Sequence, residues 1–594
     1  MVTYAAPLDD IRFVLNELLD YENTIPTLPG YEDATSDVVE SVLEENAKFC
    51  ISELLPLNLP GDAEGCHYEN GVVRTPKGFK EAYKAYCDAG WTGLSCNPEY
   101  GGQGLPKTLQ FIVSEFIVST NLSFGMYSGL SHGAYNALSA YGSDEQKQAF
   151  LPRLTNGTWS GTMCLTEAHC GTDLGLIRTR AEPDGKGAYK ISGTKIFISA
   201  GEHDMTENII HLVLAKLPDA PPGSKGISLF IVPKFLLKED GTPGMRNGVA
   251  CGSIEHKMGI KASSTCVMNF EEAEGYLVGE PHTGMASMFV MMNTARLDVG
   301  IQGLGLAETA YQTAAAYAKD RGQGRSLGGV KAPDKAADPI IVHPDVRKNL
   351  LTMRAYNEGA RALAIWIGME VDIAEKHPDA ERRQEADDLV ALMTPIIKAF
   401  FTDYGFEATN LGVQIHGGHG YIHEYGVEQL VRDARIAQIY EGANGIQALD
   451  LVGRKLGLGM GRLLRRFFHP VAAFIEENQE SAELIEFVLP LAKAFGRLQQ
   501  ATGWIAQNGL RDPEEAGAAS TDYLRLFALV ALAHIWARTA KVSLEKIDER
   551  PEFYRAKIAV ARFYMTRLLP QSSSLFATIM AGKSPLMELD EMAF

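Results

Sequence analysis

Residues 432–447 read RDARIAQIYEGANGIQ, and the glutamate in this stretch, Glu441, lies between Tyr440 and Gly442 where a loop enters a helix. Ile439 precedes this pair, and apolar surroundings raise the pKa of a carboxyl group toward neutrality, which suits a general base. The alternative is a glutamate that caps the helix or faces solvent. Because one carboxylate does not define a reaction, the rest of the chain has to supply the context.

A second candidate site lies earlier in the chain, where residues 163–178 read MCLTEAHCGTDLGLIR. Thr166 and Thr172 flank a turn that contains Gly171, at the point where we expect helix to give way to strand. Threonine hydroxyls and exposed backbone N–H groups can hydrogen-bond a planar heterocycle. Taken alone, the segment favours the alternative, an ordinary helix-to-sheet connection with capping threonines.

A third candidate site is rich in glycine, where residues 412–426 read GVQIHGGHGYIHEYG. Five glycines in fifteen residues indicate tight turns or a close approach of the backbone to a bulky group. His416, His419 and His423 suggest a metal site, but no regular helical face would present all three. The segment therefore predicts a loop that cradles a cofactor, with a structural turn as the alternative, and we expect no metal.

The apolar pattern changes twice along the chain, from helical spacing to strands and back. β-branched and aromatic runs bounded by Gly, Pro and Asp predict a compact antiparallel β domain between two helical regions. Long Ala-rich helices follow, and their short links predict a bundle. We expect an α+β fold in five parts: an N-terminal extension (1–35), an N-terminal helical domain (36–160), a middle antiparallel β domain (161–280), a C-terminal helical bundle (281–456) and an additional helical domain (457–594).

The composition is that of an ordinary globular chain, with 594 residues, 46% of them hydrophobic and 22% charged. A net charge of −19 argues against non-specific binding to nucleic acid or to anionic membranes, since both are polyanions. The eight cysteines all lie in the first 266 residues without a CxxC pair, which predicts reduced thiols. Residues 1–10 lack the features of a signal peptide, and the apolar residues 527–537 are too few to cross a bilayer. We therefore expect a cytoplasmic protein without an integral membrane segment.

Five segments, taken in order, resemble the acyl-CoA dehydrogenase family. They are CLTEAHCGTD (164–173), KIFISAG (195–201), YAKDRGQGRSL (317–327), QIHGGHGY (414–421) and the RDARIAQIYEGANGIQ segment. Each motif alone is weak to moderate, but the ordered set is highly specific. The resemblance covers most of residues 36–455.

The resemblance implies the family's fold, with a four-helix bundle at the C-terminal end and non-covalent FAD between the β domain and the bundle. It also implies a homo-oligomer, expected to be a homodimer, because the family shares its flavin sites between subunits. On the matched positions, the residues that would line the flavin ring are Met163, Leu165, Thr166, Gly171, Thr172, Phe197 and Ser199. Those that would hold the ADP portion of a flavin bound mainly by a neighbouring subunit are Arg321, Gln414, Gly417 and Gly418, with Asn444 as a further cofactor-binding candidate.

Glu441 falls on the family's catalytic base, which takes the α-proton of an acyl-CoA thioester while the β-hydride passes to flavin N5, forming a 2,3-enoyl-CoA. Thr172, Arg296 and Tyr440 fall at positions that would contact the substrate, with a surface helix arginine as the alternative for Arg296. The family implies an electron-transferring flavoprotein as the electron acceptor, and an oxidase that uses O₂ is the alternative.

Some positions depart from the family pattern. Ala443 stands where the family usually has Thr, and Gly445 stands where many members have Gln. At residues 323–325 the chain reads Gln-Gly-Arg in place of x-Phe-Gly, so the cross-subunit contact near Arg321 has to be rebuilt, and residues 328–343 are the candidate for it. These departures concern the flavin contacts more than the base.

The additions at both ends resemble an extended bacterial subgroup of the family. The opening segment, residues 4–31, favours 3-(methylthio)propanoyl-CoA of dimethylsulfoniopropionate breakdown as the substrate. One alternative is a straight-chain fatty acyl-CoA of β-oxidation, and an alternative of another class is a nucleic-acid-binding stress protein that keeps the flavin fold. The basic run RKLGLGMGRLLRR (454–466) could serve such a protein or dock on a membrane. We favour a third interpretation, a helix face that packs on the acidic body, because the whole net charge lies in residues 1–455.

Overall fold

The computed structural model describes residues 2–594, which form two compact units. The sheet unit comprises residues 48–105 and 120–298, and the helical unit comprises the N-terminal residues through Ala47 together with residues 106–119 and 299–594. Two long helices, α5 (Lys107–Tyr141) and α7 (Gly284–Asp320), belong to both units, because residues 107–119 and 299–320 are in the helical unit and the rest of each helix is in the sheet unit. The chain therefore passes between the units within helices as well as through loops.

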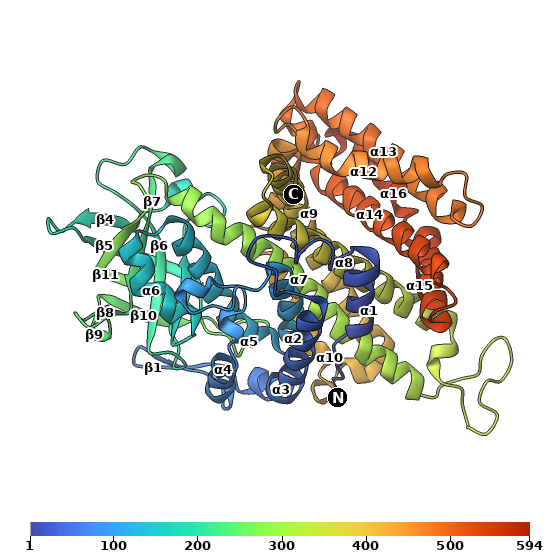
Figure 1. Ribbon diagram of the computed structural model, residues 1–594, viewed down its shortest axis with the longest axis horizontal. Helices are drawn as coiled ribbons and strands as arrows, with labels where there is room; N and C mark the ends of the chain where they lie inside the picture. The colour runs from blue at the N-terminus through green and yellow to red at the C-terminus, as the bar shows by residue number, and fades with distance from the viewer. Residues whose placement is uncertain (1) are drawn as a thin grey trace. The chain divides into compact units, whose positions relative to one another are not determined.

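A seven-stranded sheet forms the centre of the sheet unit (Figure 1). Its strand order is β10-β11-β5-β4-β6-β3, and β7 pairs with both β11 and β6. The strands are β3 (Trp159–Cys164), β4 (Arg180–Pro183), β5 (Tyr189–Ser199), β6 (Asn208–Lys216), β7 (Ile227–Pro233), β10 (Val249–Ile254) and β11 (Thr265–Val278). The rest of the unit consists of the hairpins β1 (His67–Glu69) with β2 (Val72–Arg74) and β8 (Phe235–Leu237) with β9 (Pro243–Arg246), and of the helices α3 (Leu55–Glu64), α4 (Phe79–Asp88) and α6 (Asp144–Thr155).

Strand β6 lies between two apolar cores. It is buried at every position except Lys216, as expected of a strand that is covered on both faces. Side chains alternate along a strand, so Ile210 and Leu212 enter one core while Val213 and Ala215 enter the other. The two cores fix the sheet and, with it, the loops that leave the ends of its strands.

The predicted α+β fold is confirmed with one correction: the sheet is mixed. Strand β3 pairs in parallel with β6, from Trp159 opposite Asn208 to Cys164 opposite Val213. Its sequence, WSGTMC, has small and polar residues that are buried instead of an alternating apolar pattern, so β3 was not predicted. Residues 165–179 therefore join β3 to β4, and the expected connection from helix to strand is wrong.

The helical unit contains the predicted bundle. Its helices are the second half of α7, α8 (Pro344–Lys376), α9 (Ala380–His416) and α10 (Val427–Arg435). Helices α7 and α9 approach each other through Gly303 and Gly405. A Cβ at Gly405 would lie 2.4 Å from the Gly303 carbonyl oxygen, so only glycine allows this backbone contact. The close contact fixes the position of α9 against α7, and α9 carries part of the site described below.

The additional C-terminal region forms a layer of helices beside the bundle, coloured orange to red in Figure 1. These helices are α12 (Arg462–Asn478), α13 (Ile485–Gly509), α14 (Pro513–Glu545), α15 (Pro551–Phe563) and α16 (Gln571–Met580). The Trp536 indole N–H on α14 donates a 3.0 Å hydrogen bond to the Ala355 carbonyl on α8. Two segments in residues 2–594, Ala380–Tyr421 and Pro513–Glu545, are long and apolar enough to span a membrane, but 78% and 83% of their apolar windows are buried inside the protein.

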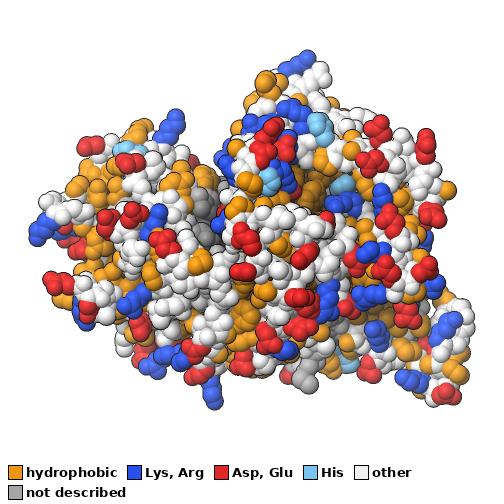
Figure 2. Space-filling model, in the orientation of Figure 1, with side chains coloured by type: hydrophobic (Ala, Val, Ile, Leu, Met, Phe, Trp, Pro, Cys, Tyr) orange, Lys and Arg blue, Asp and Glu red, His pale blue; other side chains and the backbone are white. Residues whose placement is uncertain are grey.

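The basic run at 454–466 contacts acidic side chains of the bundle. The Arg462 Nε lies 2.7 Å from Asp388 Oδ2, and the Arg466 Nη1 lies 2.8 Å from Glu385 Oε1, both on α9. On the face shown in Figure 2, acidic and basic side chains are interspersed over these helices. These ion pairs support the interpretation that this helix face packs on the acidic body.

Candidate active site

Glu441 lies in a turn with a left-handed backbone, between the 3₁₀ turn Ile436–Gln438 and α11 (Asn444–Asp450). Its φ is 56°, and Gly442 follows with a φ of 85°. A residue with a Cβ in this region costs roughly 1–2 kcal/mol, and such strain collects at functional sites. The Gln447 Nε2 donates to the Glu441 carbonyl at 3.0 Å, and the Lys398 Nζ donates to the Gly442 carbonyl at 2.9 Å. These side-chain donors hold the strained turn in place.

Two neighbours of Glu441, Tyr440 and Asn444, form hydrogen bonds within the helical unit, whereas Ile439 is 51% exposed and does not supply the expected apolar cover. The Asn444 amide donates to the Ala399 carbonyl, to Thr402 Oγ1 and to Asp403 Oδ1, at 3.1, 2.9 and 2.7 Å. Its side chain, predicted to bind the cofactor, thus binds α9 in this structure. The Tyr440 hydroxyl donates to Gln302 Oε1, and burial, reinforced by the neighbouring Glu441 carboxylate, raises the pKa of the phenol far above neutrality. Tyr440 is therefore a neutral hydrogen-bonding group beside the carboxylate.

The glycine-rich segment forms an open cradle at the end of α9. Gly417 has a φ of 59°, and a Cβ at either Gly417 or Gly418 would have no heavy atom within 4 Å. The backbone is therefore exposed with free space in front of it, as an approaching phosphate group requires. Gln414 in the last turn of α9 is exposed, as is Arg321 directly after α7. These are the four residues that the resemblance assigns to an ADP group.

The three histidines of this segment do not converge on one point. The His416 Nδ1 is 2.7 Å from the Gly412 carbonyl, the His419 Nδ1 is 2.8 Å from the Tyr317 hydroxyl, and His423 pairs with Glu428. Each imidazole thus has a partner of its own within the protein. These contacts favour the structural interpretation of the histidines over a metal site.

In the sheet unit, the loop after β3 is tied to β5. The Thr166 carbonyl accepts a 2.9 Å hydrogen bond from the Ile196 N–H, and the buried Lys195 Nζ donates to the Leu165 carbonyl and to Glu167 Oε1, both at 2.9 Å. Burial alone would raise the pKa of the Glu167 carboxyl. The Lys195 ammonium and the hydrogen bonds from residues 178 and 179 outweigh burial and lower the pKa to about 2. The loop is therefore anchored by a charged, fully bonded pair.

This anchored loop brings the predicted flavin-lining residues together. Met163, at the end of β3, and Thr166 are half-buried, and Leu165 is buried between them. Gly171 and Thr172 are exposed, and a Cβ at Gly171 would lie 3.9 Å from the Thr166 methyl group. The result is a partly open surface of small groups and hydroxyls at the end of β3.

Phe197 borders this surface from β5. Its side chain is 60% exposed and its φ is 59°, which is unusual for an aromatic residue. Ser199, two residues further on, is half-buried and pairs with Thr265 of β11. An exposed aromatic ring in a strained conformation is suited to contact a planar ring system.

Glu167, His169 and Cys170 form the one group of potential metal ligands found in residues 2–594. The Lys195 ammonium already binds the Glu167 carboxylate, and the His169 Nε2 lies 2.9 Å from the Leu176 carbonyl. A cation would have to displace both contacts. The group therefore serves to anchor the loop.

Arg296 lies on the first half of α7 and is only 7% exposed. Its Nη1 donates to Asn293 Oδ1 at 3.4 Å, and its guanidinium lies 5.9 Å from the centroid of the Phe289 ring. The alternative interpretation as a surface arginine is therefore wrong. Asp298, two residues later, was not predicted, and burial raises the pKa of its carboxyl to about 7.

The predicted residues between 163 and 296 lie in the sheet unit, and those between 321 and 444 lie in the helical unit. Sequence reasoning missed two side chains that hold predicted residues, Lys195 and Lys398, and it also missed Asp298. Lys398 stands alone in the apolar stretch LMTPIIKAFF, which is the signal by which it could have been found. The strained backbone at Glu441 and Phe197 and the open backbone at Gly417 are each features that collect at functional sites.

Comparison with known proteins specifies the class. Four family models match the chain: acyl-CoA dehydrogenase N-terminal domain (40–158), middle domain (162–273) and C-terminal domain (282–456), and acetyl-CoA dehydrogenase C-terminal like (467–590). A 3-methylmercaptopropionyl-CoA dehydrogenase of Ruegeria pomeroyi is 44% identical over 96% of this chain and 97% of its own. A butyryl-CoA dehydrogenase of Syntrophomonas wolfei is 34% identical over 100% of this chain and 99% of its own.

A crystal structure of an acyl-CoA dehydrogenase from Bacillus anthracis complexed with FAD has the same fold. It covers 100% of this chain and 94% of its own, with a TM-score of 0.75 at 22% identity. The chain belongs to the acyl-CoA dehydrogenase family, whose members are oxidoreductases that use FAD.

Proposed function

We propose that this protein oxidises an acyl-CoA thioester to the 2,3-enoyl-CoA with Glu441 as the catalytic base, and that its substrate is 3-(methylthio)propanoyl-CoA. The observation that carries the proposal is the left-handed turn that presents Glu441, held by Lys398 and Gln447. Side-chain donors that maintain a strained carboxylate are expected at a reacting centre.

The residues present fit FAD. Phe197 is exposed and follows Ile196, whose N–H bonds the Thr166 carbonyl, and Thr166 and Thr172 offer hydroxyl groups to a planar ring. Gly417 and Gly418 leave open space beside bare backbone, as a pyrophosphate requires. The residues that would hold the ring are Met163, Leu165, Thr166, Gly171, Thr172, Phe197 and Ser199, and those that would hold the ADP group are Arg321, Gln414, Gly417 and Gly418.

In the proposed reaction, the Glu441 carboxylate removes the α-proton of the thioester. The neutral Tyr440 adds no charge beside it, and Arg296 and Thr172 contact the substrate. The flavin, when bound, supplies the acceptor for the β-hydride. Apolar surroundings exclude water and strengthen hydrogen bonds to the thioester oxygen, which acidify the α-carbon.

The choice of substrate is supported by the relative from Ruegeria pomeroyi, which spans nearly the whole chain at 44% identity. The second candidate is a straight-chain fatty acyl-CoA, which the butyryl-CoA dehydrogenase at 34% identity favours. The 3-(methylthio)propanoyl chain is comparable in length to a short fatty acyl chain, so chain length alone does not distinguish the two candidates. Rates of flavin bleaching, compared across a panel of thioesters, separate them.

Substitution of Glu441 tests the base. We expect Glu441→Gln to keep its flavin while the rate of anaerobic flavin bleaching by 3-(methylthio)propanoyl-CoA falls by about 100-fold or more, the usual contribution of a general base. Glu424→Gln, at an exposed glutamate in a nearby 3₁₀ turn, is the matched control and should bleach at the wild-type rate. Wild-type bleaching by Glu441→Gln would refute the assignment. Faster bleaching by butanoyl-, octanoyl- or palmitoyl-CoA would favour the straight-chain candidate.

We further infer a cytoplasmic homodimer that passes its electrons to an electron-transferring flavoprotein. The support is family membership together with the exposure of Arg321, Gln414 and the glycine cradle, which leaves them accessible to a group bound by another subunit. Light scattering of the purified holoenzyme measures the assembly. Reduction of an added electron-transferring flavoprotein, compared with consumption of O₂, identifies the acceptor.

A further inference from the structure

Lys398 is a fully buried lysine in the middle of α9. Burying an ammonium group costs several kcal/mol unless hydrogen-bond acceptors replace its water. Its Nζ donates to the Gly442 carbonyl at 2.9 Å and to Asn444 Oδ1 at 2.8 Å. Both acceptors belong to the turn that follows Glu441, so the charge is buried against the predicted site of the base.

The same face of α9 carries the acceptors for the rest of this turn. Thr402 and the adjacent Asp403 lie about one helical turn after Lys398, on the same side of the helix. Thr402 and Asp403 accept the Asn444 amide, and Asp403 Oδ1 also accepts the Gln438 Nε2 at 2.7 Å. Gln438 precedes Glu441 and Asn444 follows it. Helix α9 therefore forms hydrogen bonds with residues on both sides of Glu441.

The position of α9, and with it that of these hydrogen bonds, is fixed by its contact with α7. The contact between Gly303 and Gly405 brings the α7 and α9 backbones together without a side chain between them. A sliding movement of α9 would open this contact. The position of the Lys398 ammonium, and through it that of the Gly442 carbonyl, is thus set by the bundle.

We propose that Lys398 is a positioning residue that sets the direction of the Glu441 carboxylate by holding the Gly442 carbonyl and the Asn444 side chain. This inference rests on the proposed function of Glu441. Without the ammonium, the Gly442 carbonyl loses the 2.9 Å hydrogen bond from Lys398 and keeps a longer one, at 3.3 Å, from the Gln447 Nε2, so the left-handed backbone at Glu441 is held less firmly. The carboxylate then moves away from the substrate α-carbon, although the residues that bind the cofactor and the acyl-CoA are unchanged.

The test compares two buried lysines. Lys398→Met removes the ammonium at nearly constant volume, and Lys398→Arg keeps the charge but changes its reach. The matched control is Lys557→Met, because Lys557 is 2% exposed, lies in the same unit and pairs with Asp10 and Glu358 instead of the turn. Each holoenzyme is examined for flavin content, for the dissociation constant of acyl-CoA from the flavin spectrum and for the single-turnover rate of anaerobic bleaching.

We expect Lys398→Met to bleach about 10- to 100-fold more slowly, the penalty of a misplaced catalytic group, while its dissociation constant changes by less than about 3-fold. Lys398→Arg should recover part of the rate. Lys557→Met should lose stability but bleach at the wild-type rate per bound flavin. Lys398→Arg also serves as the test if Lys398→Met does not fold, and it should then bleach more slowly than wild type at unchanged affinity.

A wild-type bleaching rate in either Lys398 variant overturns the proposal. So does an equal loss of rate in Lys398→Met and Lys557→Met, which would make the role of Lys398 one of general stability. If the wild-type enzyme itself is not bleached by any acyl-CoA, the proposed function fails and not merely this inference.

Discussion

Single residues with unusual backbone angles coincide with two of the predicted site positions. Glu441 and Phe197 both have φ near +60°, a region that glycine adopts without cost. Nine non-glycine residues in the part of the chain that the structure describes have a positive φ, and Glu441 and Phe197 are the two that are also predicted site positions. Local strain at these two positions agrees with a base and a ring contact.

Asp298 gives a prediction at the same scale. Burial raises its pKa to about 7, and its Oδ1 has no hydrogen-bond partner among residues 2–594. In the unfolded chain the carboxyl titrates near its ordinary value of 3.8. The folded state therefore binds the proton more tightly, and the stability from this residue is complete below about pH 4 and is lost as the pH rises through 7.

We therefore expect Asp298→Asn to raise the free energy of unfolding by about 1–2 kcal/mol at pH 8 and to leave it nearly unchanged at pH 4.5, because the amide carries no charge to desolvate. Urea unfolding at the two pH values measures the difference. Asp334→Asn, in an exposed loop, is the control and should show no such pH dependence. A gain that is equal at both pH values would contradict the assignment of a buried, titrating carboxyl group.

At the scale of elements, continuous apolar patterns predicted their elements closely. The helices expected at residues 285–321 and 343–376 are α7 and α8 to within one residue, and the strands expected at 189–200 and 209–217 are β5 and β6 to within one residue. Strand β3 was missed because its buried residues are small and polar, and only its pairing with β6 makes it a strand. The parallel pairing of β3 with β6 was not predicted, because β3 itself was missed.

The site residues that lie in local motifs were predicted from the sequence, and the isolated buried polar residues were not. Glu441, Phe197 and the glycine cradle lie in local motifs with a fixed spacing, which a sequence displays directly. Lys398 and Asp298 are single polar residues in apolar helices, and their roles depend on what the fold places opposite them. No local pattern contains that information.

The contact between α7 and α9 supports a prediction about packing. A methyl group at Gly405 would lie 2.4 Å from the Gly303 carbonyl oxygen, and backbone atoms cannot yield as a flexible side chain can. We expect Gly405→Ala to lower the free energy of unfolding by about 2–4 kcal/mol and to slow flavin bleaching, because overpacking displaces α9. Unfolding by urea and single-turnover bleaching measure the two effects.

A second glycine controls for the chemistry of the substitution. A Cβ at Gly496, in the interior of α13, would have no heavy atom within 4 Å. Gly496→Ala should therefore raise the free energy of unfolding by about 0.5–1 kcal/mol, since alanine favours the helix. Similar stability changes in the two variants would mean that the contact between α7 and α9 is looser than the structure shows.

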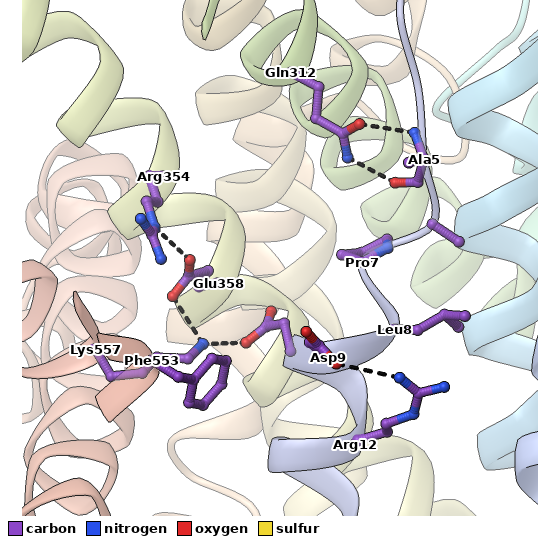
Figure 3. Close-up of a pocket in the computed structure, with 12 residues that line it drawn as sticks. Ala5, Pro7, Leu8, Asp9, Arg12, Gln312, Arg354, Glu358, Phe553 and Lys557 are labelled. Carbon is purple, nitrogen blue, oxygen red and sulfur yellow. Dashed lines mark hydrogen bonds and ion pairs between the residues drawn. The ribbon is translucent and has the colours of Figure 1, made fainter. Parts of the chain in front are cut away.

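At the scale of the helical unit, one buried arginine joins parts that are far apart in sequence. The Arg361 guanidinium on α8 pairs with Asp10 of the N-terminal extension, with Glu115 of α5 at 2.7 Å and with Glu308 of α7 at 2.9 Å. Figure 3 shows the neighbouring pairs, in which Lys557 of α15 contacts Glu358 at 2.8 Å, and Gln312 bonds the backbone of Ala5. The additions at both ends of the chain thus meet the bundle through buried charges.

The pairing of Arg361 is the reason to expect that the extensions fold with the bundle as one unit. Burying the Arg361 guanidinium costs free energy, and its ion pairs with three carboxylates offset that cost only while all three are present. An N-terminal segment that lost Asp10 would leave both Arg361 and Lys557 short of an acceptor. The charges therefore specify which segments belong together, in addition to the apolar contacts that hold them.

Replacement of Arg361 tests whether its ion pairs hold the extensions to the bundle. We expect Arg361→Met to lower the free energy of unfolding by about 3–5 kcal/mol at pH 7.5, because three buried carboxylates lose their cation. Burial already raises the pKa of the Glu115 carboxyl against the pull of Arg361, so without the arginine that carboxyl takes up a proton more readily when folded than when unfolded. Its raised folded pKa means that stability is lost as the pH rises, so the deficit of the variant should shrink at pH 5.5.

Arg562→Met, which breaks an exposed pair with Glu486, should cost less than about 1 kcal/mol at either pH. A deficit in Arg361→Met that equals that of Arg562→Met, or that does not change with pH in urea unfolding, would show that the buried charges do not hold the extensions to the bundle.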